Sequence, residues 1–254
     1  MDTKDLKFSK EHPHFSLIIP AWNEEKYLPR LLDTIEIARQ NYRGGYEAIE
    51  LILADNMSTD DTAAVGKERN LQVIRVEKRT IAAARNGGAA IARGSVLCFV
   101  DADFRIHPET FNVIADTMNS SKYIAGATGV KMERLSLGLI MTLAMMLPMV
   151  WLTKMDTGVV FCWREAFQSI EGYNEGRLFA EDVQFLFELR RLGKQYKRGL
   201  ARATKAKAIA SARKFDKHGD WHYFGFLFFF ILSFLTKKIS LDAKAQTYWY
   251  EDER

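Results

Sequence analysis

Apolar residues in the first hundred positions fall into short runs separated by amphipathic segments. Residues 15–20 (FSLIIP) form an apolar run typical of a buried strand. The apolar residues of the next segment are spaced as on one face of a helix, at Leu28, Leu31, Leu32 and Ile35. The full pattern predicts strands at 15–20, 48–54, 71–77 and 95–100 and helices at 25–40, 60–70 and 81–93. Strands that alternate with helices across short joints indicate an α/β fold with a mainly parallel sheet.

Polar residues directly follow each predicted strand. In a parallel sheet these strands all end at one edge, which is where ligands bind in such folds. The residues expected at this edge are Trp22 and Glu24 after the first strand, Asp55 after the second, Arg79 and Thr80 after the third, and Asp101 and Asp103 after the fourth. This edge is therefore the candidate ligand site.

The second half of the chain contains two long apolar stretches. Residues 135–152 carry no charge, and residues 221–235 form an aromatic-rich stretch that is followed by two lysines. A membrane-spanning helix needs about 20 apolar residues, so the first stretch is borderline and the second is short. Three interpretations stay open: burial in the protein, a position at a membrane surface and, for residues 135–152, a membrane span.

Composition places the chain among ordinary globular proteins. It has 254 residues, 48% of them apolar and 27% charged, which is enough for a hydrophobic core without disulfides. The net charge of +4 is too small to define a nucleic-acid binder, so no nucleic-acid partner is expected. Cys98 and Cys162 lie in apolar runs and the first twelve residues are polar, which favours a cytoplasmic location. The apolar stretches leave open a position at the cytoplasmic face of a membrane.

Basic residues are concentrated in one segment. Between Arg190 and Lys217 eleven residues are Lys or Arg, and one, Asp216, is acidic. Such a run fits a solvated basic face, a phosphate site or contact with an anionic membrane.

Two acidic pairs have positions suited to catalysis. Asp101 and Asp103 are separated by one residue after an apolar strand, so both carboxylates can reach one hard cation. Glu181 and Asp182 precede a helical pattern, where a carboxylate can serve as a general base. Each pair also fits a structural role, as acids in a loop or at the start of a helix. Asp55 also has two interpretations: it is an acid within a turn, or it accepts a hydrogen bond from a nucleotide.

Taken in order, these motifs resemble the family 2 glycosyltransferases of the GT-A fold. The resemblance covers about 200 residues and rests on the ordered set, because each motif alone is weak. The matching segments are IIPAWNEE at 18–25, LADNMSTDDT at 53–62, AARNGGAAIARG at 83–94, DAD at 101–103, TGVVFCWREAF at 157–167, GYNE at 172–175, AED at 180–182 and SARKF at 211–215.

The resemblance implies transfer of a sugar from a nucleoside-diphosphate sugar to an acceptor hydroxyl, with inversion at the anomeric carbon and assistance from Mg²⁺ or Mn²⁺. It implies that Asp182 is the general base and that Asp103 is a metal ligand. The match leaves open which histidine completes the metal site, His107, His218 or His222, and His218 is taken as the candidate. The residues implied for donor binding are Pro20, Trp22, Glu24, Asp55, Arg79, Thr80, Arg85 and Asp101. Arg213, in the basic segment, is added to the donor-binding candidates because a cation there can stabilise the charge on the leaving phosphate.

The chain departs from the family pattern at two positions. Thr80 stands where the family often has glycine, and Asn56 replaces a common acid, which puts the nucleotide contacts near both in doubt. The resemblance also implies one GT-A domain over 1–254, an α/β fold in which helices flank a mixed sheet, with a donor half at about 15–105 and an acceptor half at about 120–235. The apolar stretches and the basic segment favour a lipid-linked acceptor or a cell-surface glycan precursor.

Two other functions compete with this one. A sugar nucleotidyltransferase would need a glycine-rich basic loop after the first strand, whereas this chain has the acidic segment AWNEE at 21–25. A non-catalytic nucleotide-sugar-binding protein would be favoured by the loss of Asp103 or Asp182, and both are present.

Overall fold

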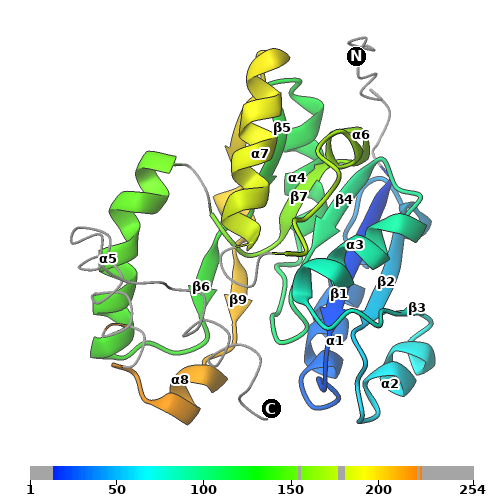
Figure 1. Ribbon diagram of the computed structural model, residues 1–254, viewed down its shortest axis with the longest axis vertical. Helices are drawn as coiled ribbons and strands as arrows, with labels where there is room; N and C mark the ends of the chain where they lie inside the picture. Colours follow the sequence, from blue (N-terminus) through cyan, green and yellow to red (C-terminus); the bar gives the residue numbers. More distant parts are fainter. Residues whose placement is uncertain (1–13, 154–155, 177–180, 222–223, 225–254) are drawn as a thin grey trace.

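A seven-stranded mixed sheet forms the centre of the computed structural model, which describes residues 14–153, 156–176, 181–221 and 224 (Figure 1). The strands are β1 (Phe15–Ala21), β2 (Ile49–Asp55), β3 (Gln72–Arg75), β4 (Val96–Phe99), β5 (Tyr123–Ala127), β6 (Val130–Met132), β7 (Val160–Trp163), β8 (Gly199–Arg202) and β9 (Ala208–Ala210). The helices are α1 (Leu28–Gln40), α2 (Thr62–Glu68), α3 (Ile81–Ile91), α4 (Thr110–Asn119), α5 (Leu137–Thr153), α6 (Arg164–Ser169), α7 (Glu181–Gln195) and α8 (Arg213–His218), with short 3₁₀ helices at Tyr46–Ala48 and Thr204–Ala206.

One strand of the main sheet, β7, runs against all the others. The order is β3-β2-β1-β4-β7-β5-β8, and β3, β2, β1 and β4 run parallel to one another. β7 is antiparallel to both of its neighbours, while β5 and β8 are parallel. β6 and β9 form a separate parallel pair. The predicted α/β fold with helices on both sides of a mixed sheet is therefore confirmed.

All four strands and all three helices predicted in the first hundred residues are present, with shifted ends. The helix expected from residue 25 begins at Leu28, because the carbonyl of Glu24 accepts hydrogen bonds from the amides of both Tyr27 and Leu28 and closes a turn first. Pro29 then occupies the first turn, where its missing amide hydrogen costs nothing. The start of this helix was therefore predicted three residues too early.

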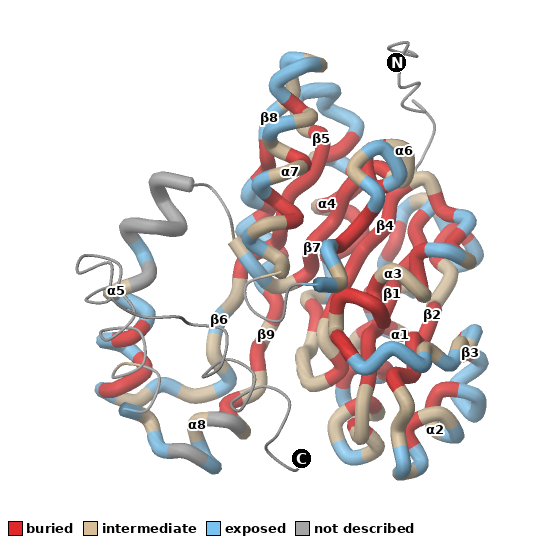
Figure 2. The backbone as a smooth tube through the Cα atoms, viewed as in Figure 1, coloured by how far each residue is buried: buried red, intermediate tan, exposed pale blue. Residues whose placement is uncertain are grey.

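Helices cover both faces of the sheet. α3 packs on β1 and β2, and α7 packs on β5 and β8, on the face toward the viewer, while α4 lies behind the sheet and packs on β5 and α1 (Figure 1). The central strands are almost wholly buried (Figure 2). The rings of Phe15, Tyr42 and Phe111 form a cluster in which the centroids lie 5.3 to 6.3 Å apart.

α5 stands away from the main sheet, next to the β6–β9 pair and α8 (Figures 1 and 2). Among the described residues its apolar stretch is largely exposed, so complete burial of this stretch is ruled out; the exposed side chains are Leu135, Leu137, Ile140, Met141, Leu143 and Leu147. Within the described ranges, no helix combines the length and the hydropathy needed to cross a bilayer. Of the second apolar stretch, 221–235, all but Trp221 and Phe224 lie outside the described residues.

Candidate active site

The residues predicted to reach one edge of the sheet come together there. The parallel register places Ala21 beside Asp55 and Ile18 beside Phe99, so the segments after β1, β2 and β4 leave the sheet at the same edge. Pro20 is buried within β1 just before this edge. The sheet itself therefore positions the candidate site.

Side-chain hydrogen bonds join the loop after β1 to the loop after β2. The amide of Asn23 donates to Ser58 Oγ at 3.0 Å, and Asn23 Oδ1 accepts from the amide of Thr59 at 2.9 Å. The amide of Glu24 donates to Thr62 Oγ1 at 2.8 Å. Asn23 adopts a φ of +54°, a conformation that asparagine tolerates better than most residues. These bonds fix the direction in which Trp22 and Glu24 leave the strand.

The two departures from the family pattern have structural reasons. Asn56 Nδ2 donates to the carbonyls of Val76 and Lys78, at 3.0 and 2.8 Å, which a carboxylate cannot do. Thr80 is the N-cap of α3, where its Oγ1 accepts from the amide of Ala83 at 3.1 Å. Its φ of −138° is ordinary extended backbone, so glycine is not required there. Both residues shape the segment between β3 and α3 that carries Arg79.

Three predicted donor residues lie along this part of the edge. The guanidinium of Arg79 stacks over the Trp22 ring at 3.9 Å from its centroid. Asp55, at the end of β2, is buried, and its Oδ1 accepts from the amide of Ser58 at 3.3 Å. The structure thus brings an aromatic ring, a cation and a carboxylate to the ends of adjacent strands.

Arg85 is a buried cation that joins three carboxylates. It lies on α3 with 5% of its side chain exposed, and its Nη1 donates to Asp182 Oδ1 at 2.7 Å and to Glu181 Oε1 at 3.2 Å. Its Nη2 donates to Asp101 Oδ1 at 3.0 Å. Burial alone would lower the pKa of Arg85, but the surrounding carboxylates, Asp182 first, hold it well above its usual value. The first acid of the DAD motif and the predicted base are therefore held by one guanidinium.

Asp182 has the electrostatic properties of a general base. Burial raises its pKa to about 6; the charge of Arg85 opposes the shift, and the charges of Glu181 and Asp101 add to it. A carboxylate with a pKa near 6 is ionised at neutral pH and is more basic than an ordinary aspartate. Its position in the first turn of α7 also suits a negative charge.

Two residues that support this cluster were not singled out from the sequence. The Tyr173 ring stacks on Phe185 with centroids 3.9 Å apart, and the Arg85 guanidinium lies 5.0 Å from the Tyr173 ring centroid. Asn86 Nδ2 donates to the Tyr173 carbonyl, and Asn86 Oδ1 accepts from the Tyr173 amide. Gly172 has a φ of +75°, and a Cβ there would lie 2.6 Å from Asn86 Oδ1. The GYNE and ARNGG motifs were the available signals, because they contain these residues.

The second acid of the DAD motif belongs to another cluster. Arg213 Nε donates to Asp103 Oδ2 at 3.0 Å, and both Nη atoms donate to the Glu24 carboxylate, at 2.6 and 2.5 Å. Asp103 and Glu24 are 13% and 4% exposed. The Arg213 guanidinium also lies 4.5 Å from the centroid of the Tyr27 ring. The carboxylates of Asp103 and Glu24 thus face one position, and the guanidinium of Arg213 occupies it.

The donor set around that position suits a hard divalent cation. Asp103 and Glu24 offer carboxylate oxygens, which Mg²⁺ and Mn²⁺ prefer, and Mg²⁺ often takes only one or two protein carboxylates together with substrate phosphates. Within the part of the chain that is described, no three His, Cys, Asp or Glu side chains form a metal-binding group. His107 Nδ1 accepts from the amide of Glu109. His222 and the side chain of His218 lie outside the described residues.

A family model and the fold decide the relationship of this chain to known proteins. The model for "Glycosyl transferase family 2" matches residues 16–142, half of the chain. This chain belongs to glycosyl transferase family 2. The match includes the loops after β1, β2 and β4 and the helix that carries Arg85, and the rest of the candidate site lies beyond it.

Curated relatives of this family 2 chain resemble it over shorter segments. The poly(ribitol-phosphate) β-N-acetylglucosaminyltransferase TarS of Staphylococcus aureus is 31% identical over 102 residues, which is 38% of this chain and 17% of the relative. The dolichyl-phosphate β-glucosyltransferase ALG5D of Trichomonas vaginalis is 35% identical over 104 residues, 38% of this chain and 32% of the relative. The chain therefore spans less than a third of the length of each of these relatives.

Solved structures confirm the GT-A fold. S. aureus TarS 1–349 in complex with UDP has a TM-score of 0.59 at 20% identity, over 78% of this chain and 60% of that chain. The mannosyltransferase PcManGT from Pyrobaculum calidifontis in complex with GDP-Man and Mn²⁺ has a TM-score of 0.57 at 17% identity, over 82% and 59%.

Asn56 stands where the family commonly has an acid, and the Asn56→Asp variant tests the structural role of its hydrogen bonds to Val76 and Lys78. In Asn56→Asp the new carboxylate faces two carbonyl oxygens that have lost their donor, so the free energy of unfolding should fall by about 1–3 kcal/mol. Urea unfolding of both proteins measures the change. Asn119→Asp, at the exposed end of α4, is the matched control, and its free energy of unfolding should lie within about 0.5 kcal/mol of the native value. Equal stability of Asn56→Asp and the native protein would contradict the proposed role.

Proposed function

We propose that this chain is an inverting glycosyltransferase that moves a sugar from a nucleoside-diphosphate sugar to an acceptor hydroxyl. The observation that carries the proposal is the Arg85 cluster, in which Asp182, with a pKa near 6, is connected to Asp101 at the edge where β1, β2 and β4 end. A base beside the end of a parallel sheet, where nucleotides bind in α/β folds, is the arrangement that such a transfer requires.

On the donor side, the first strands supply the nucleotide contacts. Trp22 and Arg79 offer a stacking surface for the base, and Asp55 offers an acceptor for a base or ribose donor. The donor is a nucleoside-diphosphate sugar, a proposal supported by relatives of the same fold whose structures hold UDP, UDP-GlcNAc or GDP-Man.

The departing diphosphate develops negative charge as the sugar leaves. Arg213, whose Nε lies 3.0 Å from Asp103 Oδ2, is placed where it can neutralise a phosphate oxygen. Asp103 and Glu24 would hold a divalent metal, and a bound Mg²⁺ or Mn²⁺ would supply Lewis-acid stabilisation of the same charge. The mannosyltransferase and a glucosyl-3-phosphoglycerate synthase of this fold have structures with Mn²⁺, which supports this assignment.

On the acceptor side, Asp182 takes the proton from the attacking hydroxyl. Arg85 fixes the orientation of the carboxylate through Oδ1, and the acceptor hydroxyl is assigned to the other oxygen. Direct attack by the acceptor from the face opposite the leaving group inverts the anomeric carbon, as it does when one base acts without a covalent intermediate. Arg85 is thus a positioning residue for the base, and it also places Asp101 near the donor.

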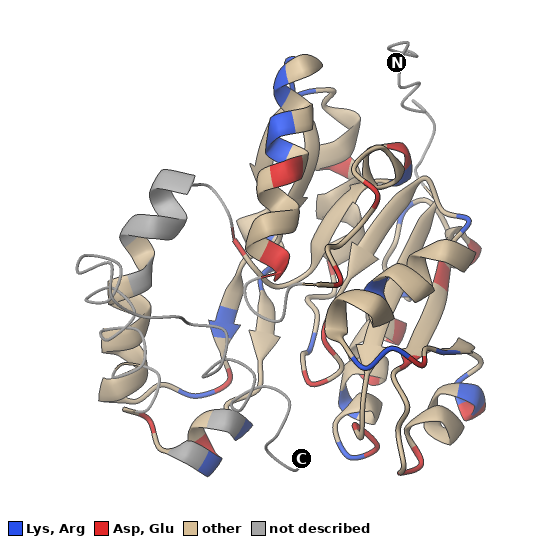
Figure 3. Ribbon diagram, viewed as in Figure 1, with Lys and Arg blue, Asp and Glu red and all other residues tan. Residues whose placement is uncertain are grey.

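The acceptor is proposed to be a lipid-linked molecule or a glycan precursor near an anionic membrane on the cytoplasmic side. The exposed apolar side chains of α5 form a surface that suits the headgroup region of a bilayer (Figure 2). Lys131 on β6 and Lys217 on α8 are exposed, and the sequence of α5 contains no charged residue (Figure 3). Relatives named as acting on poly(ribitol-phosphate) and on dolichyl phosphate support an acceptor of this class.

Asp182→Asn tests the base directly. The amide keeps the shape of the side chain but cannot take a proton, so we expect transfer to fall by about 10²- to 10⁴-fold while donor binding stays nearly unchanged. Product formation measures the first, and calorimetric titration with UDP-sugars and GDP-sugars in Mn²⁺ measures the second. Glu188→Gln, on the same helix and bonded to Gln184, is the control and should retain activity. Full activity of Asp182→Asn would remove this residue from its role.

The pH profile tests the raised pKa of Asp182. Because the base acts in its ionised form, kcat/KM should fall by about tenfold per pH unit below the pKa, which is about 6. The negative charge of Glu181 contributes to the upward shift, so Glu181→Gln should move this acid limb to lower pH. The acid limb of the kcat/KM profile of Glu188→Gln should stay at the pH of the native protein. An unshifted limb in Glu181→Gln would mean that another group is being titrated.

Sedimentation with vesicles tests the apolar surface. We expect the native protein to bind phosphatidylglycerol–phosphatidylcholine vesicles at low salt, and Leu137→Glu, at a site that is 67% exposed on α5, to lower the bound fraction severalfold. Ile37→Glu, at a site that is 49% exposed on α1, is the matched control and should bind normally. A native protein that stays in the supernatant would indicate an acceptor away from membranes.

A further inference from the structure

Arg213 occupies the position between Asp103 and Glu24 that a cation would share. Its three guanidinium nitrogens are all committed, with Nε on Asp103 and the two Nη atoms on the two oxygens of Glu24. The side chains of Arg213, Asp103 and Glu24 are 18%, 13% and 4% exposed, so their charges are poorly solvated and depend on one another. The pKa of Arg213, which burial alone would lower, is raised above its usual value, with the hydrogen bonds to Glu24 as the largest cause of the rise.

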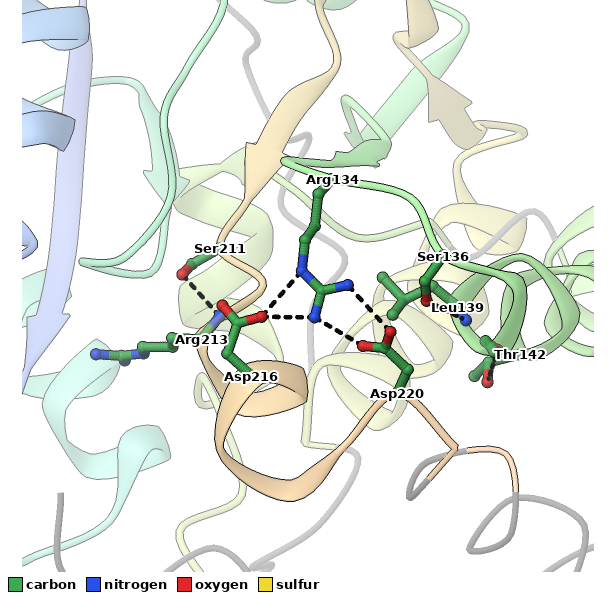
Figure 4. Close-up of polar contacts among 9 residues, drawn as sticks. Arg134, Ser136, Leu139, Thr142, Ser211, Arg213, Asp216 and Asp220 are labelled. Atoms are coloured by element: carbon green, nitrogen blue, oxygen red, sulfur yellow. Dashed lines mark hydrogen bonds and ion pairs between the residues drawn. The ribbon is translucent and has the colours of Figure 1, made fainter.

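α8 presents Arg213 to this position and is itself anchored from the other side. Arg134, which follows β6, donates to Asp216 Oδ1 through Nε at 2.9 Å and to both oxygens of Asp220 at 3.1 and 2.7 Å. Figure 4 shows Arg134 between these two aspartates, while the Arg213 side chain extends from α8 away from them. Arg213 and Glu24 are 189 residues apart in the chain, so their pairing depends on the tertiary fold, to which this anchor of α8 contributes.

We propose that Arg213 is a resident counter-cation that keeps Asp103 and Glu24 neutralised until nucleotide binds, so that divalent metal and donor bind as a coupled pair. This inference rests on the proposed function and adds to it a coupling between metal binding and donor binding. With Arg213 in place, a divalent ion at Asp103 meets a fixed positive charge within the same partly buried site, which opposes metal binding. A diphosphate offers Arg213 a different anionic partner and releases the two carboxylates.

The coupling is reciprocal. If nucleotide raises the affinity for the metal, the metal must raise the affinity for nucleotide by the same factor, and such factors are typically about 5- to 150-fold. Removal of the Arg213 charge weakens the coupling, because only direct contact between the diphosphate and the metal remains. Asp103 and Glu24 then lack a counter-ion, so the metal alone should bind more tightly, although the nucleotide loses a contact.

Binding of Mn²⁺, followed by electron paramagnetic resonance of the free ion, tests this proposal without any turnover. For the native protein we expect weak Mn²⁺ binding that becomes about tenfold tighter or more when UDP or GDP is added. For Arg213→Met we expect tighter Mn²⁺ binding without nucleotide and a coupling factor several times smaller than that of the native protein, because only direct contact between the diphosphate and the metal remains. Arg213→Lys retains the charge and should restore weak binding without nucleotide. Arg69→Met, which removes an arginine paired with Asp33 on the surface, is the charge control and should behave like the native protein.

The outcomes separate this proposal from the proposed function. Native protein that binds Mn²⁺ equally well with and without nucleotide would overturn the counter-cation role while leaving a metal-assisted transferase in place. No Mn²⁺ binding by any variant, even with nucleotide, would overturn both. Thermal unfolding of each variant shows whether it is folded. If Arg213→Met proves unfolded, Arg134→Met, which loosens the anchor of α8, takes its place, and unchanged coupling in that variant would also overturn the proposal.

Discussion

A buried guanidinium needs negative charge around it, and in this chain that requirement holds the candidate site together. Arg85 is almost fully enclosed, and the carboxylates that compensate it come from the end of β4 and the start of α7. Loss of one partner of a buried ion pair typically costs about 3–5 kcal/mol, far more than the loss of a surface pair. The position of α7, and with it the orientation of Asp182, is therefore tied to the same charge that orients Asp101.

The two acids of the DAD motif have divided roles because they meet different arginines. Asp101 is held by Arg85 on α3, whereas Asp103 is held by Arg213 on α8. One short motif thus connects the parallel half of the sheet, which carries Trp22 and Asp55, to elements that come much later in the chain. A change of charge at Arg85 removes a partner of Asp101, and a change at Arg213 removes a partner of Asp103, so either change affects the DAD motif after β4.

Local pattern predicted the fold of the first hundred residues because each strand and helix there follows its own periodicity. The ends were less predictable, since the turn at Glu24 delays α1 by hydrogen bonds that no periodicity reveals. The strand-end position of Asp55 and Asp101 followed from the sheet alone, but the partnership of Arg85 with Asp182 joins residues 97 apart, and only the tertiary fold creates it. The predicted roles of these residues in donor binding and catalysis stay predictions.

The antiparallel strand β7 has a consequence for how the molecule can vary. Ala127, at the end of β5, lies beside Val160, at the start of β7, and the amides of Thr128 and Gly129 donate to the carbonyls of Val159 and Thr157. The two ends of the segment between β5 and β7, residues 128–159, which contains β6 and α5, therefore lie side by side. Because β5 and β7 are paired at this point, an insertion, deletion or exchange in α5 need not shift any strand of the main sheet. Related chains could therefore differ in the exposed surface of α5, while Arg134 and the strand ends next to Trp22, Asp55 and Asp101 stay in place.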